Sequence, residues 1–368
     1  MSIQGAYGYQ LEQVGKPVNL AELPHLDPGV DEVIVKVAGC GVCHTDIGFA
    51  YDGVPTRHAL PLVLGHEITG RVVAAGENVL RWQDQSVIIP AVIACGECPA
   101  CRAGRPTICR KQFMPGNDGH GGFASHVRVP ARGLCPVPDK LPPGVTLETL
   151  SVVADAVTTP FEAIRRSALK AGDVAVIVGA GGIGGFGVQI AAALGARVIA
   201  IDIDTERLEL AQQYGASLAL NADQHDEKQL KSAVRGFSSQ FANPGSTLKI
   251  FEMSGTAAGQ TTAFNLLDFG AWLGVVGYTP KRIEVRLSNL MAFDATAQGN
   301  WGCPAEQYPA ALELVLQGKI AIEPFVERHP LEEAPEIMAG VARHAFGRRV
   351  VLVPNGHSKA QGGHDEKP

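Results

Sequence analysis

The chain has 368 residues, of which 46% are hydrophobic and 18% charged, and its formal net charge at pH 7 is −6. At roughly 150 residues per domain, this length allows two globular domains with large cores. Because the net charge is negative, no overall positive potential attracts polyanions, so neither nucleic acid nor an anionic membrane is expected as a partner.

The first part of the chain predicts a domain made mainly of strands and loops. In DEVIVKVAGC, the residues Val33, Val35 and Val37 alternate as one face of a strand does, and ITGRVVAAGENV and SVIIPAVIAC are further β-rich runs. Thr159 and Pro160 have the pattern of a helix start, a capping hydroxyl followed by proline at the first helical position. A helix through FEAIRRSAL is expected to follow.

From Asp173 onward the pattern changes to alternating strands and helices. The predicted strands are DVAVIV, RVIAID, LKIFEMSG and AWLGVVGY, and the predicted helices are GFGVQIAAALGA and TERLELAQQYGA. Such alternation predicts a parallel, doubly wound α/β sheet. The helix EQYPAALELVLQGK and the strand RRVVLVP come after it. We expect a mainly-β domain over 1–158 and 296–355, the doubly wound domain over 159–295, and a disordered tail over 356–368.

One stretch is long enough to be tested as a membrane span. Residues 174–196 contain Gln189 as their only polar side chain, and that length could cross a bilayer. Repeated glycines and separate strand-like and helix-like halves favour a buried strand–helix unit instead. The first residues, MSIQGAYGYQLEQ, lack the charged and apolar blocks of a signal peptide, so a cytoplasmic protein is expected.

A glycine-rich turn joins the first predicted strand of the doubly wound domain to its helix. Gly179 allows the tight turn, Gly181 lets a pyrophosphate approach the backbone, and Gly184 permits close packing of helix and strand. Such a turn is weak evidence for a cofactor site by itself. The next strand, however, ends in Asp202, at the position where a carboxylate binds a ribose 2′-hydroxyl and repels a 2′-phosphate. NAD is therefore favoured over NADP. Arg207 either pairs with a phosphate or lies on a helix face. The expected cofactor-binding residues of this region are Gly179, Gly181, Gly182, Ile183, Gly184, Asp202 and Arg207.

Four of the eight cysteines are spaced as ligands of a closed metal site. Cys95, Cys98, Cys101 and Cys109 form C-x2-C-x2-C-x7-C, and four thiolates in a short lobe suit tetrahedral structural zinc. An iron–sulfur cluster is the rival, but its motif places the fourth cysteine three residues on and before proline. Unliganded thiols are the remaining alternative.

Other cysteines give weaker signals. Cys43, in GCGVCHTD, and His66, in GHEITG, lie among glycines that let a backbone turn sharply around a metal. A core cysteine and a hydrogen-bonded histidine explain the same residues, so the pair is weak evidence alone. Cys135 and Cys303 stand apart from the others and are expected to be buried thiols.

In chain order, GCGVCHTD, GHEITGRVVAAGENV, the four-cysteine lobe, GGFASHV and VIVGAGGIG resemble the zinc-containing medium-chain alcohol dehydrogenase family. The resemblance implies a mainly-β GroES-like catalytic domain and a Rossmann cofactor domain, with NAD and two zinc ions per chain, one catalytic and one structural. It further implies that Cys43 and His66 bind the catalytic zinc, that Glu67 lies beside it, and that Asp46 orients His66.

The third ligand of that zinc departs from many relatives, which carry cysteine, or sometimes Glu or Asp, before the helix that leads to the cofactor domain. Here VVADAVTTPFEAI places Asp155 at this point, and an Asp oxygen can bind zinc. A turn or capping acid is the alternative. With Asp155 bound, the fourth position stays open for water or alcohol.

The resemblance also implies hydride transfer to the nicotinamide, with zinc stabilising an alkoxide. Thr45 matches the hydroxyl that accepts the alcohol proton. His44 matches a position that often contacts the cofactor phosphate, unless it is a surface histidine. Some relatives carry a relay histidine five residues after the cysteine ligand, where this chain has Gly48.

The segments KQFMPGNDGHGGFASHV and VVADAVTTPFEAI are similar to dehydrogenases that oxidise a ring alcohol of an acyl-CoA thioester to an enone in anaerobic aromatic degradation. A CoA thioester needs cations for its phosphates. The alternatives are a sugar or polyol dehydrogenase and a non-catalytic nucleotide-binding member of the fold. Relatives are dimers or tetramers, so a homodimer or homotetramer is expected. The candidate cations, each of which could also lie on a solvated face or contact the cofactor, are Lys281, Arg282, Arg348 and Arg349.

Overall fold

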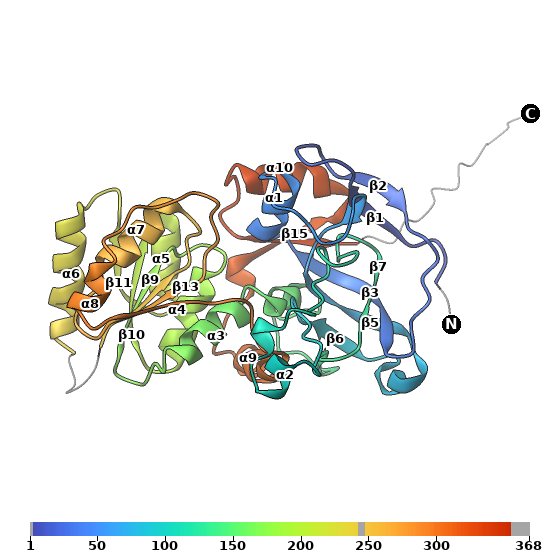
Figure 1. Cartoon of the computed structure of the whole chain (residues 1–368), viewed down its shortest axis with the longest axis horizontal. Helices are drawn as coiled ribbons and strands as arrows, with labels where there is room; N and C mark the ends of the chain where they lie inside the picture. The colour runs from blue at the N-terminus through green and yellow to red at the C-terminus, as the bar shows by residue number, and fades with distance from the viewer. Residues whose placement is uncertain (1–2, 242–246, 355–368) are drawn as a thin grey trace, which may run out of the picture.

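The computed structural model describes residues 3–241 and 247–354, which form two lobes side by side (Figure 1). The first lobe contains the N-terminal part of the chain together with its last helices and strands, and the middle of the chain builds the second lobe. The tail that was expected to be disordered, 356–368, lies outside the described residues.

Two sheets form the framework of the first lobe. A seven-stranded sheet runs in the order β15-β16-β3-β5-β6-β8, with β7 also paired to β3, and a three-stranded sheet runs β2-β1-β4. All pairs are antiparallel except β15 with β16. The strands of this lobe are β1 (Tyr7–Leu11), β2 (Asn19–Glu22), β3 (Glu32–Gly41), β4 (Leu62–Val63), β5 (Glu67–Ala75), β6 (Ser86–Ile89), β7 (His126–Pro130), β8 (Cys135–Pro136), β15 (Val326–Pro330) and β16 (Arg349–Val353).

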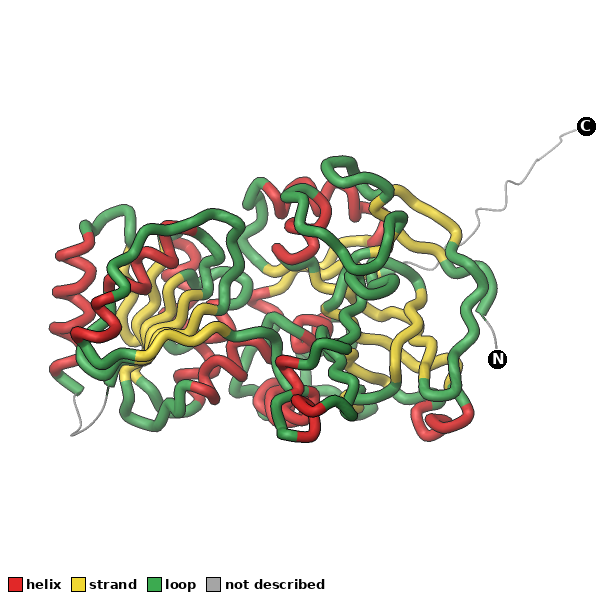
Figure 2. The backbone as a smooth tube through the Cα atoms, in the orientation of Figure 1, coloured by secondary structure: helices red, strands yellow, loops and turns green. Residues whose placement is uncertain are grey.

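Six parallel strands form the sheet of the second lobe (Figure 2). The strands are β9 (Val174–Val178), β10 (Arg197–Asp202), β11 (Ala216–Asn221), β12 (Lys249–Glu252), β13 (Trp272–Val275) and β14 (Thr296–Gly299). Their order, β11-β10-β9-β12-β13-β14, reverses direction between β9 and β12. In sheets of this kind ligands bind outside the carboxyl ends of the strands at that reversal point.

Helices connect these strands. They are α1 (His44–Ala50), α2 (Pro99–Arg102), α3 (Thr158–Arg166), α4 (Gly184–Ala193), α5 (Thr205–Gln213), α6 (Glu227–Ser239), α7 (Ala257–Asn265), α8 (Ser288–Ala292), α9 (Tyr308–Leu316) and α10 (Ala334–Ala342). Short 3-10 turns are η1 (Glu77–Trp82), η2 (Pro106–Ile108), η3 (Thr149–Ala154), η4 (Ala305–Gln307), η5 (Glu323–Phe325) and η6 (Leu331–Glu333).

Helices cover both faces of the parallel sheet, which explains why β9 is buried along its whole length. Ala175 and Ile177 of β9 pack in one apolar cluster with residues of α4 and α5, whereas Val176 packs on the other face with residues of α6 and α7. The stretch 174–196 thus divides into β9 and α4, as expected. Among the described residues, no helix combines the length and apolar character needed to cross a bilayer.

Two boundaries differ from the sequence-based expectation. Helix α3 begins at Thr158, and its N-cap residue makes no side-chain capping bond. The Thr159 hydroxyl is not a cap because it donates to Asp155 instead. The domain boundary expected at 295–296 falls before β14, which pairs with β13 and so belongs to the second lobe. The segment TAQG lacks an alternating apolar pattern, so nothing in the sequence marks it as a strand.

Candidate active site

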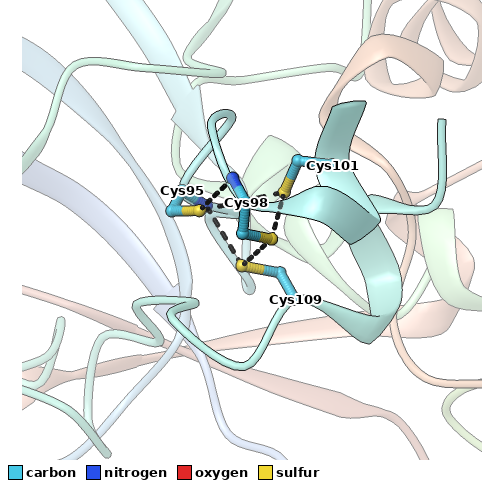
Figure 3. A group of neighbouring side chains, drawn as sticks. All are labelled: Cys95, Cys98, Cys101 and Cys109. Atoms are coloured by element: carbon cyan, nitrogen blue, oxygen red, sulfur yellow. Dashed lines mark hydrogen bonds between the residues drawn. The ribbon is translucent and has the colours of Figure 1, made fainter. Parts of the chain in front are cut away.

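The four cysteines of the predicted structural zinc site converge on one point beside α2 and η2 (Figure 3). The Sγ atom of Cys98 lies 3.5 Å from that of Cys101 and 3.8 Å from that of Cys109, and the Sγ atoms of Cys95 and Cys101 are 4.0 Å apart. All eight cysteines of the chain are free. Four sulfurs at these separations fit a tetrahedral zinc site without an open position.

Backbone amides prepare this cluster for thiolates. The pKa of Cys95 is lowered to about 6, chiefly by the N–H of Glu97. Burial, and then the neighbouring Cys98, raise the pKa of Cys101 to about 12. A divalent cation at this point would bind the cysteines as thiolates and displace their protons.

A second cluster forms where three loops of the first lobe meet. Cys43 lies between β3 and α1, His66 directly precedes β5, and Asp155 follows η3. Oδ2 of Asp155 is 3.7 Å from Sγ of Cys43 and 3.6 Å from Nε2 of His66. With a carboxylate oxygen of Glu67, these ligand atoms all lie within 4.8 Å of one another. A thiolate, an imidazole and a carboxylate around one centre are the donors of a catalytic zinc with a position left for substrate.

Asp46 is fully buried behind this cluster. Its Oδ1 is 3.3 Å from Nδ1 of His66 and accepts the N–H of Gly65, while its Oδ2 accepts the N–H of Cys43 at 2.9 Å. This carboxylate therefore directs Nε2 of His66 toward the cluster. Burial by itself lowers the pKa of His66, but Asp46 and Asp155 raise it well above its usual value. The cluster thus attracts positive charge.

Glu67 differs from the other members of the cluster because a cation already pairs with it. Arg349 donates from Nε to Oε2 of Glu67 at 3.1 Å and from Nη2 to Oε1. Both side chains are buried. Burial raises the pKa of Glu67 to about 7, and the guanidinium of Arg349 opposes that shift. Arg349 therefore does not belong to a basic surface for CoA phosphates, whereas Lys281, Arg282 and Arg348 are exposed.

The glycine loop lies against the same ion pair. Gly179 has a φ of +91°, and a Cβ atom there would be 2.5 Å from the backbone that follows β12. A Cβ on Gly184 would be 1.6 Å from the carbonyl oxygen of Gly179, so both positions need glycine. A Cβ on Gly182 would lie only 3.4 Å from Nη1 of Arg349. The Glu67–Arg349 pair therefore joins the metal cluster to the loop that begins α4.

Asp202 ends β10 and is bonded to the same loop. Its Oδ2 accepts the N–H of Ala180 at 2.6 Å, and its Oδ1 accepts the N–H groups of Ile203 and Asp204. The carboxylate thereby fixes the glycine loop at the carboxyl end of the neighbouring strand, next to Ile183 at the start of α4. This is where an acidic side chain binds the cofactor ribose in sheets of this kind.

Arg207 covers the outer side of the loop. Its Nη1 lies 3.4 Å from the position of a Cβ on Gly181, and its Nη2 donates to the carbonyl oxygen of Phe346 at 3.3 Å. Asp204 pairs with it at 3.6 Å. Arg207 thus faces the glycine loop and bridges α5 to the segment that precedes β16.

A pair of histidines lies near the arginines that surround the loop. His44 stacks on His344 with ring centroids 5.1 Å apart. The pKa of His44 is lowered to about 4, first by desolvation and then by Arg349, His344 and Arg207. Cations gathered beside glycine amides at a helix start suit a pyrophosphate. Sequence reasoning missed His344, because no motif marks it and its partner lies far away in the chain.

The first turn of α1 carries the remaining site residue. Oγ1 of Thr45 is 3.6 Å from Sγ of Cys43. At Gly48, one turn further along, a Cβ would contact Cγ2 of Val54 at 3.4 Å and Cε1 of Tyr278 at 3.9 Å. The loop after β13 therefore lies beside the helix that carries Thr45.

Comparison with known proteins agrees with this geometry. Residues 29–139 match the family described as alcohol dehydrogenase GroES-like domain, and residues 182–317 match the one described as zinc-binding dehydrogenase. An alcohol dehydrogenase from Geobacillus stearothermophilus is 30% identical over 345 residues, which cover 93% of this chain and 98% of that relative.

Solved structures share the whole architecture. Galactitol-1-phosphate dehydrogenase from Escherichia coli has a TM-score of 0.84 at 26% identity, covering 95% of this chain and 100% of its own. A zinc-binding dehydrogenase from Sinorhizobium meliloti 1021, bound to NADP, has a TM-score of 0.80 at 27% identity, covering 95% and 99%. The predicted GroES-like and Rossmann domains are confirmed. Zinc and a nicotinamide dinucleotide fit the two clusters and the glycine loop.

Proposed function

Because the chain belongs to the zinc-dependent medium-chain alcohol dehydrogenase family, it is an NAD(P)-linked dehydrogenase of alcohols or polyols, and we propose that Cys43, His66 and Asp155 hold its catalytic zinc. The observation that carries this proposal is the ion pair of Glu67 with Arg349. Glu67 lies in the metal cluster, and Arg349, which is bonded to it, lies against the glycine loop. Metal and dinucleotide would thus lie close together, as hydride transfer from an alcohol to a nicotinamide requires.

Zinc held by Cys43, His66 and Asp155 would supply a Lewis acid to the substrate oxygen. Thr45, beside Cys43, would accept the hydrogen bond of the substrate hydroxyl at Oγ1 and pass its own hydroxyl proton on to solvent. Asp46 keeps the His66 imidazole oriented, and Glu67 remains paired with Arg349 next to the cluster. Cys95, Cys98, Cys101 and Cys109 hold the structural zinc.

We propose NAD as the preferred cofactor. The carboxylate of Asp202 lies at the end of β10, bonded to the glycine loop, where it would accept a ribose hydroxyl and repel a 2′-phosphate. Arg207 and His44 would meet the pyrophosphate. An Asp202→Asn variant should narrow the preference for NAD over NADP by about tenfold or more, an energy of roughly 1.4 kcal/mol. An unchanged ratio of kcat/KM values would reject this role.

The proposed substrate is 6-hydroxycyclohex-1-ene-1-carbonyl-CoA, oxidised to the 6-oxo enone. Similarity of residues 111–127 and 152–164 to dehydrogenases of this thioester supports the proposal. Lys281 and Arg282 follow Tyr278, which lies beside Gly48 of α1, so their exposed cations are available to CoA phosphates.

A polyol phosphate is the second candidate substrate. Galactitol-1-phosphate dehydrogenase, a relative over nearly the whole chain, acts on such a compound by its name. The same exposed cations could bind a single phosphate, so the two candidates differ mainly in the apolar bulk of the substrate.

A substrate panel decides between them. NAD and NADP reduction should be measured with the hydroxyacyl-CoA, the free cyclic alcohol, galactitol 1-phosphate and simple alcohols, on protein with two zinc ions per chain. We expect the highest kcat/KM with the thioester, and at least a tenfold loss when CoA is removed, about 1.4 kcal/mol. Lys281→Ala should raise the KM for the thioester only. Preference for galactitol 1-phosphate, or equal rates with the free ring alcohol, would exclude the CoA proposal.

We also propose a homodimer or homotetramer in the cytoplasm. Within the described sheet β14 pairs only with β13, and Leu287, Met291 and Phe269 nearby are more than two-thirds exposed. An unpaired edge with apolar side chains favours association. Free cysteines throughout the chain are typical of a reducing compartment. Light scattering coupled to size exclusion tests the assembly, and a monomer at micromolar concentration would refute it.

A further inference from the structure

We infer that Thr159 is a positioning residue that holds Asp155 with one carboxylate oxygen turned away from the metal. This inference rests on the proposed ligand set and adds a requirement to it. Thr159 is buried at the start of α3, one helical turn after Asp155, and the sequence alone suggested only a helix cap for it.

The backbone around Asp155 is fixed from two sides. The carbonyl oxygen of Ala154 accepts the buried Tyr308 hydroxyl at 2.5 Å, and the Thr158 hydroxyl donates to the same oxygen at 3.2 Å. The carbonyl oxygen of Asp155 accepts the N–H of Thr159 at 2.8 Å. The main freedom left to Asp155 is therefore rotation of its side chain.

The Thr159 hydroxyl removes that freedom by donating to Oδ1 of Asp155. The other oxygen, Oδ2, is the one that lies 3.6 Å from Nε2 of His66 and 3.7 Å from Sγ of Cys43. The two oxygens thus have different partners: one faces the metal cluster and the other is bonded to α3.

This difference matters because a carboxylate offers two ligand atoms where a thiolate offers one. A carboxylate that binds zinc through both oxygens would use the position that the substrate oxygen needs. A hydrogen bond to Oδ1 keeps Asp155 a one-atom donor and leaves that position open. A cysteine at residue 155 would need no such partner, so the requirement for Thr159 arises from the aspartate.

The test measures zinc retention of the zinc-loaded enzyme against increasing chelator, with the four-cysteine zinc as an internal reference. Thr159→Val keeps the shape of the side chain but removes its hydroxyl. It should weaken binding of the catalytic zinc by about 10–100-fold, the range for partners that orient a ligand. Thr159→Ser, which restores the hydroxyl, should behave as the unmodified protein. Ser167→Ala is the control, because it removes a buried hydroxyl at the other end of α3 that donates to the carbonyl oxygen of Ile164 and contacts no ligand.

A double-variant comparison separates this role from simple packing. In an Asp155→Cys background, Thr159→Val should change zinc retention by less than about threefold, because the interaction it breaks no longer exists. Equal retention in Thr159→Val and Thr159→Ser would overturn the inference, and so would an undiminished effect in the cysteine background. Asp155→Ala tests the ligand set separately: if it keeps both zinc ions, the proposed ligands are wrong, whereas loss of one ion with an unaffected Thr159→Val rejects only the role of Thr159.

Discussion

The ion pair of Glu67 with Arg349 should be one of the most sensitive contacts of the fold. Glu67 is 0% exposed and Arg349 6%, and two hydrogen bonds join them. Removing one member of a buried pair leaves an uncompensated charge, which costs about 3–5 kcal/mol. We therefore expect Arg349→Met, which keeps side-chain length, to lower the free energy of unfolding by that amount. Glu67→Gln should also be costly, because it leaves the guanidinium buried without its counter-charge.

The double variant gives the sharper expectation. Replacing both members removes both charges at once, and whole-pair replacement is often nearly neutral. Glu67→Gln with Arg349→Met should therefore be less destabilised than the sum of the single variants by at least about 2 kcal/mol. The matched control is the exposed pair of Arg235 with Asp268, which has the same two-bond geometry at 2.9 and 3.1 Å. Arg235→Met should cost less than about 1 kcal/mol.

Urea unfolding of the zinc-loaded protein, followed by tryptophan fluorescence, measures these energies. The three tryptophans lie in both lobes, at Trp82, Trp272 and Trp301, and unchanged m-values would show that the same surface unfolds. A loss of less than about 1 kcal/mol in Arg349→Met, no more than removal of a surface pair costs, would refute a stabilising role of the buried pair. Single effects that add within about 0.5 kcal/mol would refute the coupling between the two residues.

Three further outcomes are expected. Gly184→Ala should abolish NADH binding in a fluorescence titration, because its Cβ would lie 1.6 Å from a carbonyl oxygen of the same loop. In Gly181→Ala the new Cβ would lie 3.4 Å from the flexible end of Arg207, so this variant should fold and bind NADH more weakly. Cys109→Ser should lose one of the two zinc ions in metal analysis while the catalytic zinc stays, and retention of both would contradict the four-cysteine site. Burial, and then His58, lower the pKa of His120, so the unfolded chain binds more protons and the free energy of unfolding should fall as pH drops below about 6.5. His120→Asn should therefore make the urea midpoint less dependent on pH between about pH 5 and 7, and an unchanged pH dependence would reject this role of His120.

Features set by short stretches of chain could be predicted from the sequence. The strand–helix alternation after Asp173 predicted the parallel sheet, because side-chain periodicity reflects local backbone geometry. The glycine spacing from Gly179 to Gly184 predicted a turn that only glycine can make, and the structure shows the backbone contacts behind it. The strand β14 escaped prediction because TAQG gains its strand conformation from pairing with β13 and not from its own pattern.

The candidate site also has one part that short stretches of chain determine and one part that depends on contacts between distant segments. The sequence by itself determined the four-cysteine site. Its ligands lie in one short segment, 95–109, and their spacing limits the conformations that this segment can adopt around a metal. Family resemblance named Cys43, His66 and Asp155 as ligands of one zinc, but only the tertiary structure brings them together, and only it pairs Arg349 with Glu67. The physical reason is that these contacts depend on how distant strands and loops pack. Spacing along the chain carries no information about which oxygen of a carboxylate faces a metal and which one a neighbouring helix holds.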